Sequence, residues 1–450
     1  MRLFGTDGIR GDSTSFPFDN RTLNIIGKSI VEVLNSKGCV LIVRDTRESG
    51  KRIQRELAKG IVDTGCKPVF GGVMPTPAAS LLVQKENYST AIVISASHNP
   101  YIDNGIKIFN SKGYKLADSK AAKIEKKIKE YIKLKTIVPK KKIVVKEEFV
   151  FLKFYEEFIL KNFVGYFLKG QTIVLDCANG ASYKCACYIF EKLGARVVAL
   201  NVKPDGKNIN LACGTLYPQQ LVNAVKKFKA FCGFAFDGDA DRLMCVDENG
   251  FIRDGDYFLS SMAKWLKSKN RLKNNTLVTT IMANTGLFQA MKREKIKVVT
   301  SNVGDRYVME YMKKYKSTFG GEQSGHFIFK DVLVAGDGIL SAVMILSALC
   351  DTNKSMSEFM NVMERFPQVL LNKKVCQKVP IDKLLNSCKL IENYKKLLGI
   401  NGRIVVRYSG TEDILRIMVE GEDSDQVKII ADDIAASIEK EIKLIKNRSL

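Results

Sequence analysis

The chain has 450 residues, too many for one ordinary hydrophobic core, and this length suggests about three domains. Hydrophobic residues make up 46% of it and aromatic residues 9%, which excludes a disordered protein. No apolar run approaches the roughly 20 residues that a membrane-spanning helix needs, and the first residues lack the apolar segment of a signal peptide. These features predict a soluble cytoplasmic protein.

Lysine and arginine number 71 against 48 acidic residues, so the formal net charge is +23. Such a surplus is typical of proteins that bind nucleic acid and of proteins that steer anionic substrates. Much of it is lysine on expected helices, as in residues 120–146, without an arginine-rich tail. We therefore favour a solvated lysine-rich surface and keep nucleic-acid binding as the alternative. The eleven scattered cysteines, without a C-x-x-C pair, predict reduced thiols.

Three segments repeat one plan, in which an apolar strand is followed by a short polar turn and then a helix. The expected strands cover residues 40–43, 172–175 and 276–281. Continuous apolar strands that alternate with helices indicate α/β layers with mostly buried sheets. Three such starts, far apart along the chain, predict three related α/β domains.

The C-terminal part of the chain follows a different pattern. Residues 403–407 and 414–420 are expected strands on either side of a turn, and apolar residues then recur at helical spacing from Val427 to Ile442. A fourth, smaller α+β domain is expected to begin near Phe366. The predicted domains are residues 1–145, 146–250, 251–365 and 366–450.

The first motif with chemical content is Ser95-Ala96-Ser97-His98-Asn99-Pro100, which follows the apolar run 91–93. A strand that ends in small residues before this turn would present the Ser97 hydroxyl to a cleft. Asparagine and proline are also common turn formers, so this motif alone leaves a functional loop and a plain turn equally open.

The second motif, Asp237-Gly238-Asp239-Ala240-Asp241, follows the apolar run 231–236. Alternate carboxylates separated by small residues can converge on one cation, and their oxygens suit Mg²⁺. An EF-hand loop also spaces acidic residues by two, but here the chain returns to apolar strand without the closing glutamate. A solvated acidic turn is the alternative, although three carboxylates this close would repel one another without a cation or base nearby.

Two glycine-containing loops complete the set. The loop Gly320-Gly321-Glu322-Gln323-Ser324-Gly325-His326 offers the hydrogen-bonding groups that sugar hydroxyls require. The loop Arg407-Tyr408-Ser409-Gly410-Thr411-Glu412 places an arginine, two hydroxyls and backbone N–H groups around a glycine turn, which suits a phosphate. Each is weak evidence alone, because a glycine-containing turn is often only a turn. The chain's two histidines, His98 and His326, both fall inside these motifs.

In this order, the four motifs resemble the phosphoserine, metal, sugar-specificity and phosphate-binding loops of the α-D-phosphohexomutase superfamily, over essentially the whole chain. The sequences of three segments, Phe4–Gly11, Ser95–Pro100 and Gly321–His326, are similar to those of the bacterial phosphoglucosamine mutases. The resemblance implies an α/β protein with four domains around a central cleft. The first three domains would share a mixed α/β sandwich core, and the fourth would be a smaller α+β domain.

The activity that this resemblance implies is that of an isomerase. It would convert glucosamine 6-phosphate to glucosamine 1-phosphate through a phosphoserine and a 1,6-bisphosphate, supplying UDP-N-acetylglucosamine for cell-wall synthesis. A sister mutase, a phosphomannomutase or phosphoglucomutase, would use the same machinery, and only the sugar loop and the N-terminal motif favour glucosamine. A metal-dependent phosphatase is a third alternative, but a dedicated hydrolase would not need a loop for a second phosphate.

The resemblance also implies roles for individual residues. Ser97 would be phosphorylated, with Arg10 and His98 in contact with it and Lys107 acting in proton transfer. One Mg²⁺ per subunit would be held by Ser97, Asp237, Asp239 and Asp241. The expected sugar contacts are Glu322, Ser324 and His326. The expected contacts to the phosphate that is not transferred are Arg407, Ser409, Gly410, Thr411 and Arg416.

One residue departs from the family pattern, since Asp413 stands where members usually carry proline. We expect its side chain to point away from the ligand. The expected partner is a small sugar phosphate, with neither nucleic acid nor a membrane, and the chain is a candidate homodimer.

Overall fold

The computed structural model describes residues 3–5, 7–135, 143–148, 150–163, 168–408 and 413–448. The chain divides into two compact units, Met1–Thr280 with Lys297–Asn361 and Ile281–Ile296 with Val362–Leu450. The predicted phosphate-loop residues Ser409, Gly410 and Thr411 lie outside the described residues.

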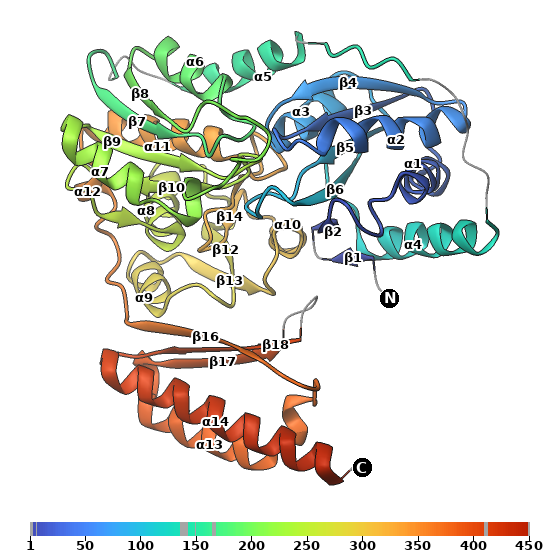
Figure 1. The fold of residues 1–450 in the computed structure, drawn as a ribbon. Helices are drawn as coiled ribbons and strands as arrows, with labels where there is room; N and C mark the ends of the chain where they lie inside the picture. Colours follow the sequence, from blue (N-terminus) through green and yellow to red (C-terminus); the bar gives the residue numbers. More distant parts are fainter. Residues whose placement is uncertain are drawn as a thin grey trace. The chain divides into compact units, whose positions relative to one another are not determined.

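The first sheet of the larger unit has six strands in the order β1-β2-β6-β5-β3-β4 (Figure 1). Its strands are β1 (Phe4–Gly5), β2 (Gly8–Asp12), β3 (Cys39–Arg44), β4 (Lys67–Val73), β5 (Thr90–Ile94) and β6 (Asp103–Asn110). The helices that contact it are α2 (Gly50–Asp63), α3 (Thr76–Lys85) and α4 (Asp118–Lys133), and α1 (Asn20–Leu34) packs against α2 and α4. Helices cover both faces of the sheet, so consecutive apolar residues such as Val40, Leu41 and Ile42 are all fully buried.

The second sheet has five strands in the order β11-β10-β9-β7-β8. They are β7 (Thr172–Asp176), β8 (Arg196–Leu200), β9 (Cys232–Phe236), β10 (Leu243–Val246) and β11 (Ile252–Arg253). The accompanying helices are α5 (Val150–Leu160), α6 (Cys185–Lys192) and α7 (Gln219–Phe228). The amphipathic helix α7 buries Leu221, Val222 and Val225 against this sheet, which explains its apolar spacing.

The third sheet has four strands in the order β13-β12-β14-β15. They are β12 (Thr276–Thr280), β13 (Lys297–Ser301), β14 (Phe319–Gly321) and β15 (Phe327–Phe329). The helices of this part are α8 (Gly255–Ser268), α10 (Asp305–Lys314), α11 (Gly338–Thr352) and α12 (Met356–Phe359). Helix α11 is apolar on all sides because it is buried along most of its length.

The three sheets share one topology. A central strand (β3, β7 or β12) pairs in parallel with a second strand on one side and a third strand (β5, β9 or β14) on the other. A fourth strand (β6, β10 or β15) then pairs antiparallel with the third. This repetition confirms the prediction of three related α/β domains, and the predicted starts are the central strands. The turn between the third and fourth strands therefore has an equivalent place in all three domains.

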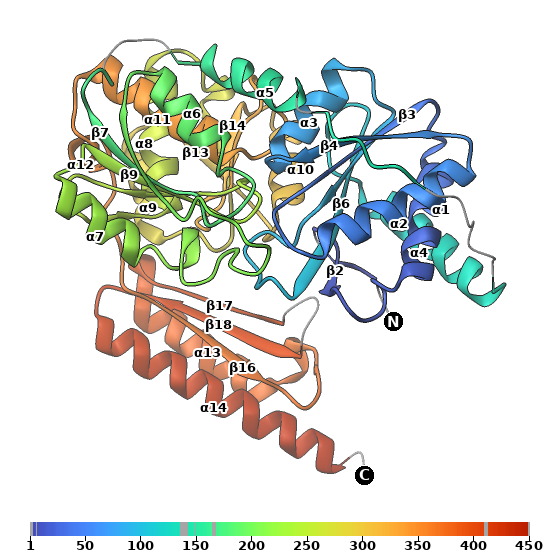
Figure 2. The ribbon, with the colours of Figure 1, turned by 45° about the horizontal axis from the view of Figure 1, so that its top comes forward.

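The smaller unit contains an antiparallel sheet in the order β16-β18-β17. Its elements are α9 (Thr285–Arg293), β16 (Gln368–Lys374), α13 (Leu385–Leu398), β17 (Arg403–Tyr408), β18 (Ile414–Glu420) and α14 (Ser424–Arg448). Figure 2 shows α13 and α14 side by side along one face of the sheet. The periodic residues Val427, Ile434 and Ile442 are buried there, so the predicted α+β domain is confirmed.

Residues 281–296 pack with the smaller unit although the sequence places them within the expected third domain. The buried Glu420 carboxylate accepts hydrogen bonds from the Thr285 hydroxyl at 2.7 Å and from the Gln368 side chain at 2.7 Å. The domain boundaries drawn from the sequence remain predictions. Short 3-10 helices cover Gly214–Leu216, Lys273–Asn275, Ile381–Lys383 and Gly399–Asn401. Within the described ranges, none of the helices combines the length and the apolar character needed to cross a membrane.

Candidate active site

Three of the predicted motifs occupy the equivalent turn in the three related domains. The Ser97 loop joins β5 to β6, the three aspartates lie between β9 and β10, and the loop of His326 joins β14 to β15. The Ser97 hydroxyl donates a hydrogen bond to Asp237 Oδ2 at 2.5 Å. His326 Nδ1 lies 3.7 Å from Asp241 Oδ1. Residues that are far apart in the sequence therefore meet because the carboxyl ends of the third strands converge.

Ser97 has a left-handed backbone with φ of 56°. This conformation costs a residue with a side chain roughly 1–2 kcal/mol, so the surrounding structure must hold it. Hydrogen bonds from the buried Arg47 guanidinium stabilise this backbone conformation. Its Nη2 donates to the carbonyl oxygens of Ser97 at 3.0 Å and Asn99 at 2.8 Å, and its Nη1 donates to that of Asp103 at 3.0 Å.

A second layer of hydrogen bonds orients Arg47. Asp45 Oδ2 accepts from Arg47 Nε at 2.9 Å and from the Ser95 hydroxyl at 2.6 Å. The Ser95 oxygen in turn accepts from the Ser97 backbone N–H at 2.9 Å. From the second domain, the Asn210 amide donates to the Ser97 carbonyl at 2.9 Å. The serine is therefore presented by a buried network and not by a loose turn.

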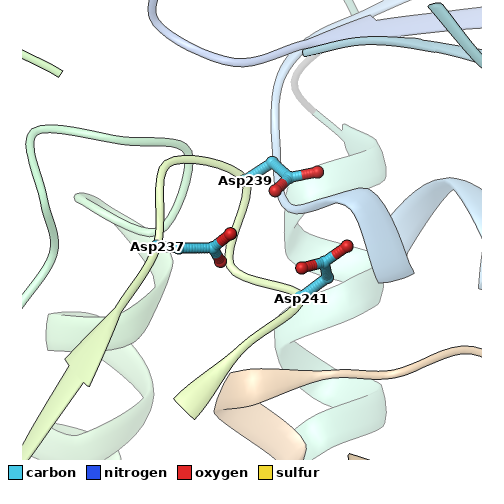
Figure 3. Close-up of side chains that lie close together, drawn as sticks. All are labelled: Asp237, Asp239 and Asp241. Carbon is cyan, nitrogen blue, oxygen red and sulfur yellow. The ribbon is translucent and has the colours of Figure 1, made fainter. Parts of the chain in front are cut away.

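The side chains of Asp237, Asp239 and Asp241 point toward one another (Figure 3). One carboxylate oxygen from each lies within 4.8 Å of the others, and all three residues are buried. Burial and the neighbouring carboxylates raise the pKa of Asp237 to about 7. Gly238 has no substitute here, because a Cβ would lie 2.6 Å from the Ser97 carbonyl oxygen.

The aspartate cluster fits a metal ion on its own chemistry. Asp239 Oδ1 is buried without a hydrogen-bond partner, which is unfavourable for a carboxylate oxygen unless a cation faces it. The donor set is made entirely of carboxylate and hydroxyl oxygens, which suit a hard divalent cation. The prediction of a metal-binding aspartate loop is therefore supported by the geometry of the described residues.

Lys107 on β6 reaches the same cluster and is almost fully buried. Its Nζ lies 2.6 Å from Asp239 Oδ2, 3.0 Å from Asp241 Oδ2 and 3.3 Å from Asp7 Oδ2. Burial alone would lower the pKa of Lys107, but Asp239 and Asp241 raise it well above its ordinary value. Burial alone would raise the pKa of Asp241, but Lys107, His326 and Lys115 together lower it well below its ordinary value. Lys107 thus places a buried positive charge against the aspartate cluster.

Two further predicted residues lie beside Ser97. His98 Nδ1 is 3.2 Å from the Ser97 hydroxyl oxygen, and burial together with Arg242 and Arg10 lowers the pKa of His98 to about 3. Arg10 Nη1 donates to the Asn99 side chain at 3.5 Å. A neutral imidazole and an arginine therefore flank the serine loop.

The sugar-loop residues differ in their surroundings. Glu322 Oε1 accepts from the Gly304 backbone N–H at 3.0 Å, and burial raises its pKa. His326 is buried, with Nε2 3.5 Å from Asp305 Oδ2. Ser324 is exposed at the tip of the turn.

In the smaller unit, the predicted phosphate ligands Arg407 and Arg416 are opposite each other on β17 and β18. Like charges directly opposite each other on neighbouring strands repel. Asp413 Oδ1 lies 3.4 Å from Lys378 Nζ, and 81% of the Asp413 side chain is exposed. The negative charge that departs from the family pattern therefore has a local cation.

The sequence did not single out five residues that organise this site. They are Asp7, Arg47, Lys115, Asn210 and Asp305. Asp7 lies inside the N-terminal motif, which was a signal for it. The others act through contacts between residues far apart in the chain, and no local pattern marks them.

Comparison with known families defines the class of protein. Family models described as phosphoglucomutase/phosphomannomutase match as alpha/beta/alpha domain I at residues 1–135, domain II at 154–250 and domain III at 254–366. The model of the C-terminal domain matches residues 364–437. All four domains of a phosphohexomutase are present, and the chain is an enzyme of this class.

Curated relatives narrow the class further. A phosphoglucosamine mutase of Desulfotalea psychrophila is 40% identical over 448 residues, covering 98% of this chain and 99% of the relative. That of Clostridium acetobutylicum is 41% identical over 455 residues, covering 98% and 99%. The chain therefore belongs to the phosphoglucosamine mutase family, as its motifs predicted.

Solved structures agree on the fold. A phosphoglucomutase/phosphomannomutase family protein from Burkholderia thailandensis has a TM-score of 0.80 at 22% identity, covering 97% of both chains. The N-acetylphosphoglucosamine mutase of Aspergillus fumigatus, solved in complex with GlcNAc-6P and magnesium, has a TM-score of 0.66 at 16% identity and covers 98% of this chain and 96% of its own.

Proposed function

We propose that the protein interconverts glucosamine 6-phosphate and glucosamine 1-phosphate through phosphorylated Ser97. The observation that carries this proposal is the position of the Ser97 hydroxyl, 2.5 Å from the aspartate cluster that also holds Lys107. A hydroxyl between a cation site and a fixed ammonium suits phosphoryl transfer, which needs positioning and charge neutralisation more than covalent help. The naming of the curated relatives as phosphoglucosamine mutases favours glucosamine as the sugar.

In the first transfer, O1 of glucosamine 6-phosphate bonds to the phosphorus of phospho-Ser97, and the bond from phosphorus to the Ser97 oxygen breaks. One proton passes overall from the sugar hydroxyl to the serine oxygen. The resulting 1,6-bisphosphate reorients, and its 6-phosphoryl group returns to Ser97 by the reverse step. Glucosamine 1-phosphate leaves, and the phosphoenzyme is restored.

Asp237, Asp239 and Asp241 would hold Mg²⁺ together with an oxygen of phosphorylated Ser97. When bound, the ion neutralises charge that develops on the transferred group. Lys107 presents a second positive charge, and Arg10 and His98 orient the serine loop. We assign Lys107, whose ammonium lies at the aspartate cluster, the part in proton transfer that the family resemblance implies.

We assign the sugar hydroxyls to Glu322, Ser324 and His326, and the phosphate that is not transferred to Arg407, Ser409, Gly410, Thr411 and Arg416. The Aspergillus fumigatus relative was solved with GlcNAc-6P and magnesium, which supports an amino-sugar phosphate and a magnesium ion as ligands. We also propose a cytoplasmic location. Nucleic-acid binding leaves the aspartate cluster without a role, so it is not favoured.

The direct test is replacement of the serine, Ser97→Ala. We expect turnover to fall by at least about 10⁴-fold, because no other residue takes over as the phosphoryl carrier. Intact-mass measurement after priming with glucose 1,6-bisphosphate should find one added phosphoryl group on the wild type and none on the variant. Ser89→Ala, a change at a hydroxyl that donates to the Cys39 carbonyl at 3.0 Å, is the matched control. Substantial turnover by Ser97→Ala would refute the assignment.

A further inference from the structure

Lys115 is a buried cation that the proposed mechanism leaves without a role. It follows β6 in the loop before α4, and its backbone forms an isolated bridge with Phe109. A hydrogen bond of 2.9 Å from the Asn110 N–H to the Tyr114 carbonyl closes the turn that presents it. Only 15% of the side chain is exposed, so its charge must be matched inside the protein.

The Lys115 ammonium contacts two carboxylates from different parts of the larger unit, Asp7 and Asp305. Although burial opposes it, these two carboxylates raise the pKa of Lys115 well above its ordinary value. Asp7 belongs to the N-terminal motif of domain I. Asp305 is the first residue of α10 in domain III. One side chain therefore joins the two domains at a buried point.

On the domain I side, Asp7 leads directly to the transfer site. Its Oδ2 accepts from Arg10 Nη2 at 2.5 Å and lies 3.3 Å from Lys107 Nζ. The carboxylate that Lys115 neutralises is thus also a partner of the arginine and the lysine assigned to phosphoryl transfer. Without the Lys115 charge, the Asp7 carboxylate would interact more strongly with its two remaining cations, Arg10 and Lys107.

On the domain III side, Asp305 leads to the sugar loop. Its Oδ2 lies 3.5 Å from His326 Nε2. The preceding residue, Gly304, donates its N–H to Glu322 Oε1 at 3.0 Å. The start of α10 therefore supports both buried side chains that we assign to the sugar hydroxyls.

We propose that Lys115 is a positioning residue that ties the sugar-contacting loop of domain III to the transfer site of domain I. This inference rests on the proposed function, because it gives that site a further component that sets sugar selectivity. We call the two ion pairs of Lys115, with Asp7 and with Asp305, the tie. Through it, the positions of Glu322 and His326 depend on the same ammonium that holds Asp7. A cavity of about 230 Å³, lined in part by Lys115, Asp305 and His326, adjoins the tie and leaves these side chains room to shift when it is broken.

The neighbouring ion pair between Arg306 and Asp118 provides a matched control. Arg306 Nη2 lies 2.7 Å from Asp118 Oδ1, so this pair also crosses from domain III to domain I. The Arg306 backbone N–H donates to Asp305 Oδ1 at 2.8 Å, but within the described residues the Arg306 and Asp118 side chains form no hydrogen bond or ion pair with Asp7 or the sugar loop. Asp118→Asn therefore weakens a contact between the two domains without changing the contacts that position the sugar loop.

The test measures kcat/KM of the full chain, primed with glucose 1,6-bisphosphate and Mg²⁺, on glucosamine 6-phosphate and glucose 6-phosphate. Lys115→Met keeps the length of the stem and removes the charge. We expect kcat/KM on glucosamine 6-phosphate to fall by at least about tenfold, and the preference for glucosamine to fall by at least about threefold. Lys115→Arg and Asp118→Asn should both stay within about threefold of the wild type in each quantity.

Asp305→Asn keeps the side-chain shape and should reproduce the loss of preference, which guards against a folding defect of Lys115→Met. The double variant Lys115→Met with Asp305→Asn should lose no more than about threefold beyond Lys115→Met alone, because both changes break one tie. An unchanged sugar preference in an active Lys115→Met protein overturns the inference. An equal loss in Asp118→Asn overturns it too, in favour of simple cross-linking. A wild type that turns over no hexose phosphate overturns the proposed function as well.

Discussion

The charged form of the Asp237 carboxylate is favoured by one contact and disfavoured by its other surroundings. It accepts a hydrogen bond from the Ser97 hydroxyl at 2.5 Å, yet burial together with Asp241 and Asp239 raises its pKa to about 7. Lys107 pairs with Asp239 and Asp241, and the charge of Arg242 offsets only part of the rise in the pKa of Asp237. At the scale of single residues, the cluster is therefore built for more positive charge than Lys107 and Arg242 supply.

This imbalance predicts a distinctive effect of Asp237→Asn. Removing one of three repelling carboxylates should leave the metal-free variant at least as stable as the metal-free wild type. The wild type should gain melting temperature when Mg²⁺ is added, since binding to the folded state stabilises it, and the variant should gain much less.

Thermal unfolding with chelator and then with Mg²⁺ measures both effects. Asp351→Asn, which removes a carboxylate paired with Lys269 at 2.7 Å outside the cluster, is the control and should respond to Mg²⁺ as the wild type does. An equal Mg²⁺ response in Asp237→Asn would contradict the assignment of the cluster as the metal site.

At the scale of elements, the loop after β5 is held by side chains that come from the loop after β3 and from the second domain. Arg47 donates to four carbonyl oxygens, those of Ser97, Asn99, Pro100 and Asp103, and Asn210 donates to the first two of them. A planar guanidinium with several donors can do this, whereas a lysine ammonium cannot span the same acceptors.

Arg47→Lys should therefore lower kcat by about tenfold to a hundredfold, because Ser97 loses its fixed position. Arg52→Lys is the matched control, since Arg52 Nη1 also donates to a backbone carbonyl, that of Phe18 at 2.8 Å, but does not touch the serine loop. Both variants should lose some stability, and only Arg47→Lys should lose turnover. Equal kcat values for the two variants would show that the network does not position the serine.

Helix α11 provides a test of pH dependence at the same scale. Asp337 caps its first turn by accepting the Leu340 N–H at 3.0 Å, and the Tyr155 hydroxyl of α5 donates to it at 3.0 Å. Burial raises the pKa of Asp337 from 3.8 to about 7. The folded state therefore holds this proton more tightly than the unfolded state does.

The stability that this proton contributes is complete below the unfolded pKa and is lost as the pH rises from about 4 to about 7. The upper bound of the loss is about 4 kcal/mol. Asp337→Asn should flatten that part of the stability curve, as measured by denaturant unfolding over this pH range. Identical pH profiles for the variant and the wild type would rule out Asp337 as the source.

At the scale of the whole molecule, three domains share one topology, and each carries a different functional loop at the equivalent turn, after β5, β9 or β14. The sequence predicted the central strands because their apolar runs are continuous, as expected for strands buried on both faces. It also predicted the serine, aspartate and sugar loops by their composition. It did not predict the three-residue strand β14, which is too short to carry a pattern, or the packing of residues 281–296 with the smaller unit.

The residues that join the loops were not predictable in the same way. Lys115 and Asp305 are 190 positions apart, and each looks like an ordinary surface charge in its local sequence. Arg47 follows its strand in a polar turn, and only the fold brings it to the carbonyls of a loop 50 positions away. Local composition thus identified the groups that do chemistry, while tertiary contacts identify the groups that position them.

The central claim, that this phosphohexomutase acts on glucosamine phosphate through the site of Ser97, is tested most directly by a substrate panel. Purified protein primed with glucose 1,6-bisphosphate and Mg²⁺ would be assayed for kcat/KM on glucosamine, glucose and mannose 6-phosphates. We predict a preference for glucosamine 6-phosphate of about tenfold or more, or roughly 1.4 kcal/mol of transition-state binding. A preference for glucose or mannose 6-phosphate would contradict the proposed substrate, and no turnover of any of the three would contradict the proposed function.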